Sequence, residues 1–216
     1  MAIRFSRPNQ PPPEPPTHVI LASQSMGRKG LLEKLGIRFR VAVSRIDEET
    51  VTDKDPLTLI KKRASAKANE IVSHPRVYNL AEDAKTFVIA ADSMAVVGKK
   101  TYGKAVDRDD ATRIVKALMG KTHIFVTGIH CLFYEEGKVK KHWEKIVKTK
   151  VTLRKLSAME IESYVARYDF TRYAAGYALN DAPWDLVTKV DGSYTNVIGL
   201  PFEVLLPILR TLNIIL

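Results

Sequence analysis

The sequence predicts an α/β fold arranged as a single domain with two lobes. Short apolar runs of strand length are followed by segments whose apolar residues have helical spacing. The 216 residues are long for one compact unit and short for two independent domains. The chain is 45% apolar and 27% charged, which is ordinary for a globular protein that buries a core.

The first 16 residues differ in composition from the rest of the chain. They contain the proline run NQPPPEPP, which favours an extended polyproline conformation and supplies few backbone donors. We predict that residues 1–16 are a disordered, proline-rich tail and that residues 17–216 form the single domain. A ligand for a proline-binding module is the alternative interpretation of this run.

The first half of the domain is predicted to alternate strands and helices. The run HVILAS, which begins at His18, predicts a strand, and RKGLLEKLG predicts a helix that ends at Gly36. IRFRVAV alternates as a half-exposed strand does. Pro56 begins a helix that is predicted to reach about Val72. TFVIAAD predicts a strand that is buried on both faces and ends at Asp92.

A third helix and a hairpin follow in the middle of the chain. Asp109 is expected to cap a helix that runs to about Met119 and is ended by Gly120. The segments HIFVTGIHCLFY and HWEKIVKTKVTL are predicted to be strands, and EEGK between them resembles a hairpin loop.

The last part of the chain returns to helices. Ser157 and Glu160 form a capping box before a helix predicted to reach about Arg167. A short strand is expected around residues 186–190, and it leads through the turn DGSY to a final apolar helix over residues 201–212. No internal repeat is present in the sequence.

Charge and cysteine content limit the classes of function. The net charge is +10, from 34 Lys and Arg against 24 Asp and Glu, and it favours polyanions such as nucleotides. A solvated basic surface is the alternative, because these residues are not clustered. Cys131 is alone, which excludes a disulfide and fits a reducing, cytoplasmic location. No apolar stretch reaches the roughly 18 residues of a membrane span, and none resembles a signal peptide.

The segment LASQSMGRK is the first candidate for chemistry. It places Ser23 and Ser25 between a predicted strand and a predicted helix, where free backbone N–H groups and the helix dipole favour an anion. Arg28 or Lys29 could add charge-assisted hydrogen bonds to a phosphate. Serines in such a place also serve as simple helix N-caps, so both interpretations stay open.

Asp92 is the second candidate, and it is followed by Ser93. A carboxylate after five apolar residues is costly unless it is paired or bound to a metal. Acidic residues at strand ends in α/β folds hold divalent ions or orient water. The alternative is a structural acid that caps a turn.

Several lysines and histidines also have both a functional and a structural interpretation. Lys104 and Asp107 lie in the turn-like segment YGKAVDRDD, and Lys67 lies on the second predicted helix; each lysine could neutralise phosphate or be solvated. DGSYTNVIGLP predicts backbone close to a ligand or a tight turn. His123 and His130 are predicted on opposite faces of one strand, so they are not expected to share a metal, and His123 is expected to join a buried polar network.

These segments, in this order, resemble the Maf family, which is related in fold to inosine triphosphatase-like pyrophosphatases. The stretches that carry the resemblance are LASQSMGRKGLLEKLGIRF, SAKA, VIAADSMAVV, YGKAVD, MGKTHIFVTG and GSYTNVIGLP. They cover nearly the whole chain from about residue 19 to residue 212. The resemblance implies an elongated mixed sheet flanked by helices, with a cleft between two lobes.

The resemblance also implies an activity: hydrolysis of a nucleoside triphosphate to the monophosphate and pyrophosphate. It implies a divalent cation (Mg²⁺, Mn²⁺ or Co²⁺), a homodimer, and a role in cleansing the nucleotide pool of non-standard or pyrimidine nucleotides. By position, Asp92 corresponds to the catalytic acid, and Asp92 and Glu48 to metal ligands. The substrate-binding residues implied are Ser23, Ser25, Arg28, Lys67, Ser93, Lys104 and Asn180.

The chain departs from the family pattern at several of these places. Gly27 replaces one of two arginines, for which Lys29 could compensate in part, and Ser93 replaces a threonine. Arg172 and Tyr173 replace an Asp-Lys pair, and Asn180 takes the place of a glutamine. These departures leave the preferred base unassigned.

The same departures motivate an alternative function, a nucleotide-binding regulatory module that no longer hydrolyses and is linked to cell division. A nucleic-acid-binding protein is a third hypothesis, motivated only by the net charge of +10.

Overall fold

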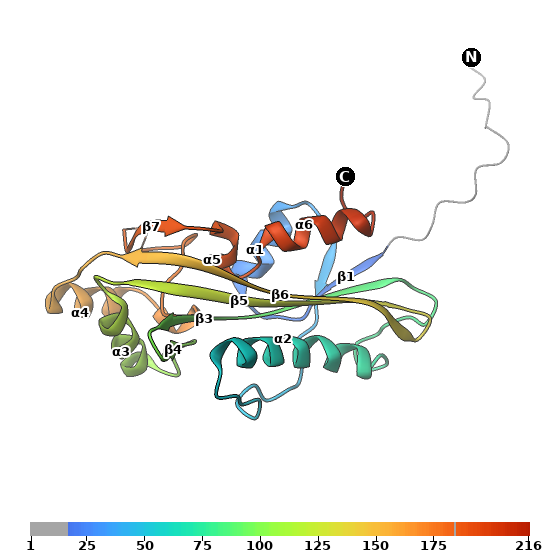
Figure 1. Ribbon diagram of the computed structural model, residues 1–216, viewed down its shortest axis with the longest axis horizontal. Helices are drawn as coiled ribbons and strands as arrows, with labels where there is room; N and C mark the ends of the chain where they lie inside the picture. Colours follow the sequence, from blue (N-terminus) through green and yellow to red (C-terminus); the bar gives the residue numbers. More distant parts are fainter. Residues whose placement is uncertain (1–16, 184) are drawn as a thin grey trace, which may run out of the picture.

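A computed structural model describes residues 17–183 and 185–216, so the predicted tail of residues 1–16 lies outside the described part. One long twisted sheet runs through the molecule, with helices packed on both of its faces (Figure 1). The strand order is β2-β1-β3-β5-β6-β7, and β4 pairs with β3. The strands are β1 (His18–Leu21), β2 (Phe39–Val41), β3 (Thr86–Val97), β4 (Lys100–Tyr102), β5 (Thr122–Glu135), β6 (Lys138–Leu153) and β7 (Val187–Asp191).

The sheet is mixed, as expected. β1 is parallel to both β2 and β3, whereas β3, β4, β5, β6 and β7 pair in antiparallel fashion. The helices are α1 (Met26–Lys34), α2 (Pro56–Ser73), α3 (Arg108–Leu118), α4 (Ala158–Arg167), the 3-10 turn η1 (Phe170–Arg172), α5 (Tyr194–Ile198) and α6 (Phe202–Thr211). In the described part of the chain, no helix is both long and apolar enough to span a membrane.

The alternation of side chains along β3 explains why helices cover both faces of the sheet. Phe87 and Ile89 belong to a core cluster with residues of α1 and α6, whereas Val88 and Ala90 belong to a cluster with residues of α2. A period of two therefore sends successive apolar side chains to opposite helical layers. The prediction that this strand is buried on both faces is confirmed.

A separate core cluster forms the second lobe. There Phe125 of β5 and Val151 of β6 pack against Ile114 and Leu118 of α3 and Ile161 of α4. Figure 1 shows α3 and α4 gathered at one end of the long sheet, with α1 and α6 toward the other. The expected two lobes therefore share one sheet, and each has its own apolar core.

Most predicted elements agree with the structure within a few residues. Gly36 and Gly120 follow α1 and α3 with positive φ angles of 69° and 71°, as expected of residues that end helices. The capping box of Ser157 and Glu160 at the start of α4 is confirmed, with both reciprocal hydrogen bonds present. The predicted hairpin is β5 and β6, and its turn contains Glu136 and Gly137.

Two expectations were wrong in detail, and some short elements were not predicted. Asp107, not Asp109, caps α3, because its side chain accepts a hydrogen bond from the backbone N–H of Asp110 at 2.8 Å. The short elements β4 and α5 were not predicted. Asp92 does not end its strand, because β3 continues to Val97 along β5. The neighbouring parallel strand β1 ends earlier, at Leu21, which lies opposite Ile89 of β3. Asp92 therefore lies on β3 just beyond the end of β1.

Gly128 of β5 sets how closely α2 approaches the sheet. It lies opposite Asp92, and a Cβ atom placed on it would be 2.5 Å from Cγ2 of Ile60, a fully buried residue of α2. We expect Gly128→Ala to lower the free energy of unfolding by about 1–3 kcal/mol, because the added methyl group overpacks this contact. Urea denaturation measures the change.

Gly30→Ala is the matched control for this prediction. A Cβ atom at Gly30 of α1 meets no atom within 4 Å, so alanine should stabilise the helix slightly there. If Gly128→Ala unfolds at the same urea concentration as the wild type, the close packing of α2 on β5 does not require a glycine at position 128.

Candidate active site

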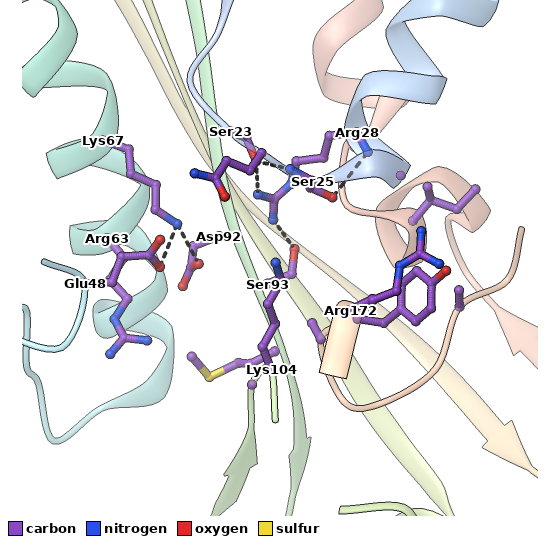
Figure 2. Close-up of a pocket in the computed structure, with 18 of the residues that line it drawn as sticks. Ser23, Ser25, Arg28, Glu48, Arg63, Lys67, Asp92, Ser93, Lys104 and Arg172 are labelled. Carbon is purple, nitrogen blue, oxygen red and sulfur yellow. Dashed lines mark hydrogen bonds and ion pairs between the residues drawn. The ribbon is translucent and has the colours of Figure 1, made fainter. Parts of the chain in front are cut away.

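A cleft of about 570 Å³ opens beside β3, just beyond the end of β1. Its lining comes from both lobes: the loop after β1, α1, α2 and β3 on one side, and residues 103–106 and 172–180 on the other. All nine residues predicted for the site line this one cleft: Ser23, Ser25, Arg28, Glu48, Lys67, Asp92, Ser93, Lys104 and Asn180. Figure 2 shows the side chains of all of these residues except Asn180, which extend into the cleft from separate elements.

Asp92 and Glu48 meet at the ammonium group of Lys67. The Nζ atom of Lys67 lies 3.0 Å from Oδ1 of Asp92 and 2.8 Å from Oε2 of Glu48 (Figure 2). The Asp92 and Lys67 side chains are nearly buried, whereas Glu48 is about half-exposed on its loop. The burial cost of Asp92 is therefore offset by a cation, as the sequence required.

The loop after β1 is built to expose backbone donors at the start of α1. Ser25 is the N-cap of α1, and its side chain accepts a hydrogen bond from the backbone N–H of Arg28. The hydroxyl oxygen of Ser23 accepts a hydrogen bond from the backbone N–H of Ser25 at 3.2 Å. The N-terminus of α1, which is the positive end of the helix dipole, therefore borders the cleft, and this arrangement favours the binding of an anion. The capping and anion-binding interpretations of these serines are compatible.

Arg28 is buried and its guanidinium group joins three segments of the chain. It donates to Oγ of Ser23 at 3.0 Å, to Oγ of Ser93 at 2.9 Å and to the carbonyl oxygen of Gly199 at 3.0 Å. Burial lowers the pKa of Arg28, an effect opposed by the nearby carboxylates of Asp92 and Glu48. Arg28 thus organises the cleft in addition to lining it.

A series of buried hydrogen bonds holds the side chain of Ser93 in place. Oγ of Ser93 lies 2.9 Å from Oγ1 of Thr127, which donates to the carbonyl oxygen of Asn196 at 3.0 Å. Asn196, fully buried on α5, donates to Oγ1 of Thr149 at 3.0 Å. The sequence left two interpretations of DGSYTNVIGLP, contact with a ligand or a tight turn. In the structure this segment supports Ser93 through Asn196 and contributes Val197 and Ile198 to the cleft lining.

The opposite side of the cleft carries Lys104 and the loop that departs most from the family pattern. Residue 104 forms a β-bridge with Ala174, which holds this loop against the turn after β4. Burial and the nearby Arg28 lower the pKa of Lys104. Arg172 and Asn180 are exposed at the mouth of the cleft. The hydroxyl of Tyr173 donates to Asp181, and burial is the main cause that raises its pKa to about 12.

The structure explains Gly27 and removes Lys29 from the site. A Cβ atom at Gly27 would lie 2.9 Å from the carbonyl oxygen of Ile198, so a larger side chain would push α5 away. Lys29 does not line the cleft; it pairs with Glu33 at 3.6 Å on the exposed face of α1. The expectation that Lys29 could compensate in part for the missing arginine was therefore wrong, because its side chain extends away from the cleft.

Several cleft residues were not predicted, among them Phe125, Tyr177 and Arg63. Phe125 and Tyr177 form an apolar part of the lining, and Arg63 lines the α2 side. Arg63 precedes Lys67 by four residues, so helical spacing alone could have placed both on one face. His123 is buried and has a hydrogen-bond partner, as predicted. Its Nε2 atom lies 2.8 Å from the hydroxyl oxygen of Tyr177, and burial lowers the pKa of His123 to about 4.

An α/β protein whose cleft combines a helix N-terminus, several cations and two converging carboxylates has the features of a protein that binds phosphorylated substrates. A family model described as "Maf-like protein" matches residues 18–212. The chain belongs to this family, and the family prediction made from the motifs is confirmed.

Two curated relatives with the same name cover most of this chain. A dTTP/UTP pyrophosphatase of Chelativorans sp. (strain BNC1) is 36% identical over 189 residues, which cover 87% of this chain and 88% of the relative. A dTTP/UTP pyrophosphatase of Agathobacter rectalis is 32% identical, with 92% and 98% covered. The enzyme class expected from the motifs agrees with these names.

A solved structure of a nucleoside-triphosphatase/dITP/XTP pyrophosphatase from Mycobacterium abscessus shares 13% identity with a TM-score of 0.39, covering 90% of this chain and 94% of that one.

Proposed function

We propose that this chain hydrolyses a nucleoside triphosphate between the α- and β-phosphates, releasing a nucleoside monophosphate and pyrophosphate. Pyrimidine nucleotides such as dTTP and UTP, and modified forms of them, are the first candidates because the curated relatives carry that name. The observation that supports hydrolysis most strongly is that the Asp92–Lys67–Glu48 group lies in the same cleft as the loop after β1 that carries Ser23 and Ser25.

The two carboxylates suit a divalent cation. They converge on one point, the Nζ atom of Lys67, and no group of three or more His, Cys, Asp or Glu side chains in the described ranges is placed to hold a metal alone. Mg²⁺ commonly binds through one or two carboxylates and takes its other ligands from water and substrate phosphates. Asp92 and Glu48 fit that pattern. A bound divalent ion would neutralise phosphate charge and lower the pKa of a bound water.

The residues of the chain itself divide the remaining work. Ser23, Ser25 and the N-terminus of α1 would bind phosphate oxygens, and Arg28 and Lys104 would offset the charge that develops on them. The Asp92 carboxylate would accept a hydrogen bond from the attacking water and orient it in line with the bond that breaks. Lys67 holds Asp92 in place and balances its charge.

The base of the nucleotide would lie toward the second lobe. Phe125 and Tyr177 offer an apolar surface there, while Arg172 and Asn180 stand at the mouth of the cleft with polar groups. These side chains would choose among bases. The homodimer and the cytoplasmic location implied by the family resemblance stay predictions.

A nucleotide panel tests the proposed function. We expect pyrophosphate release from at least one of dTTP, UTP, CTP or a modified pyrimidine triphosphate in the presence of Mg²⁺, Mn²⁺ or Co²⁺. Chelation with EDTA should reduce turnover to background, and added metal should restore it. Metal-dependent binding without any release of pyrophosphate across the panel would favour the non-hydrolysing nucleotide-binding module instead.

A further inference from the structure

Arg63 lies on the face of α2 that borders the cleft. It precedes Lys67 by four residues, one helical turn, so both side chains extend from the same side of the helix. Arg63 is half-buried and is part of the cleft lining (Figure 2). Its position on a well-packed helix, rather than on a loop, fixes where its guanidinium group can reach.

The guanidinium group of Arg63 has no protein partner in residues 17–183 and 185–216. Its Nε atom is buried without a hydrogen-bond acceptor. Neither Glu48 nor Glu49, which line the same cleft, forms an ion pair with it. A buried N–H donor without an acceptor is costly, and the cost is higher for a charged group. A ligand with anionic oxygens would remove this cost.

The other cations of the α1 and α2 side are already engaged. The charge of Lys67 is balanced by Glu48 and Asp92, and the guanidinium group of Arg28 donates to two serines and a carbonyl oxygen. Since residue 27 is glycine, α1 brings only one guanidinium group to the cleft. Arg63 is therefore the uncommitted cation of this side among the described residues.

We propose that Arg63 binds non-bridging oxygens of the substrate's polyphosphate from the α2 side of the cleft. The identity of the substrate rests on the proposed function; the assignment of an anion-binding role to Arg63 rests on its geometry. The planar guanidinium group can donate two parallel hydrogen bonds to a phosphate, which a lysine in its place cannot do. Arg63 thus raises affinity for the polyphosphate without contacting the base.

Turnover measurements test the role with substrate. For Arg63→Gln we expect KM for the best nucleotide to rise by about 10-fold or more, with a smaller change in kcat, because a binding interaction is lost. The KM of Arg63→Lys should lie between those of the wild type and Arg63→Gln, since lysine keeps the positive charge but cannot donate two parallel hydrogen bonds. Lys62→Gln is the matched control: it removes a charge from the preceding residue, which pairs with Asp53 outside the cleft lining.

A second measurement does not depend on catalysis. Inorganic tripolyphosphate should raise the Tm of the wild type and of Lys62→Gln, and should raise that of Arg63→Gln much less. The Tm of Arg63→Gln without ligand should not fall below that of the wild type, because a guanidinium group without an acceptor does not stabilise the fold. If Arg63 were purely structural, Arg63→Gln would have a lower Tm than the wild type without ligand, and tripolyphosphate would raise the Tm of both proteins equally.

The outcomes separate the two proposals. If no nucleotide is hydrolysed but tripolyphosphate stabilises the wild type more than Arg63→Gln, the proposed function fails and the role of Arg63 stands. If Arg63→Gln matches the wild type in KM and in its response to tripolyphosphate, or if tripolyphosphate stabilises neither protein, the assignment of Arg63 is overturned.

Discussion

Asp92→Asn should lower kcat by at least about 100-fold, while substrate binding is largely kept. Asparagine has nearly the same shape but cannot carry the negative charge that orients water and helps to hold a divalent cation. The ammonium group of Lys67 keeps its contact with Glu48, at 2.8 Å, so the cleft does not lose its other ion pair. Steady-state release of pyrophosphate, compared with calorimetric binding of the nucleotide, measures both effects.

Asp83→Asn provides the control, because Asp83 is an exposed carboxylate outside the cleft lining. It should leave kcat and binding unchanged. Turnover of Asp92→Asn equal to that of the wild type would remove Asp92 from the chemistry and with it the proposed mechanism.

Lys67→Met should be the most destabilising change in the cleft, lowering the free energy of unfolding by about 3 kcal/mol. The substitution leaves the Asp92 carboxylate nearly buried without the cation that lies 3.0 Å from it. Activity should fall as well, because Asp92 and Glu48 lose the group that holds them together. Chemical denaturation of both proteins gives the stability difference directly.

The double variant Lys67→Met/Asp92→Asn isolates the cause of this loss. With the carboxylate also removed, much of the lost stability should return, since no unpaired buried charge is left. Lys62→Met, which removes an exposed lysine from the same helix, should unfold close to the wild type. A double variant as unstable as Lys67→Met alone would show that packing of the lysine stem, and not its charge, stabilises the site.

Long, strongly patterned elements were predictable from the sequence. The apolar run that became β3 and the capping box of Ser157 and Glu160 each carry a local signal that tertiary contacts did not override. The elements β4 and α5 have three and five residues, too few for a period to show. The end of β3 was misplaced at Asp92 because antiparallel pairing with β5 continues the strand past a charged residue, which composition does not reveal.

The cleft was predictable as a set of residues but not as a set of contacts. Each motif at a strand or helix end could be assigned to anion or metal chemistry from residue type alone. The sequence could not show that Lys67 lies between Asp92 and Glu48, or that Arg28 reaches Ser93 and Gly199, because these contacts join elements far apart along the chain. Arg63 was overlooked because it belongs to no motif, although its spacing from Lys67 was visible.

The most direct test of the proposed activity identifies the phosphorus products. Wild-type protein, Mg²⁺ and the best nucleotide of the panel are followed by ³¹P NMR until the triphosphate is consumed. We expect nucleoside monophosphate and pyrophosphate in equal amounts, with no nucleoside diphosphate at any time. Nucleoside diphosphate and inorganic phosphate would contradict this expectation, because they show cleavage at the γ-phosphate and not between the α- and β-phosphates.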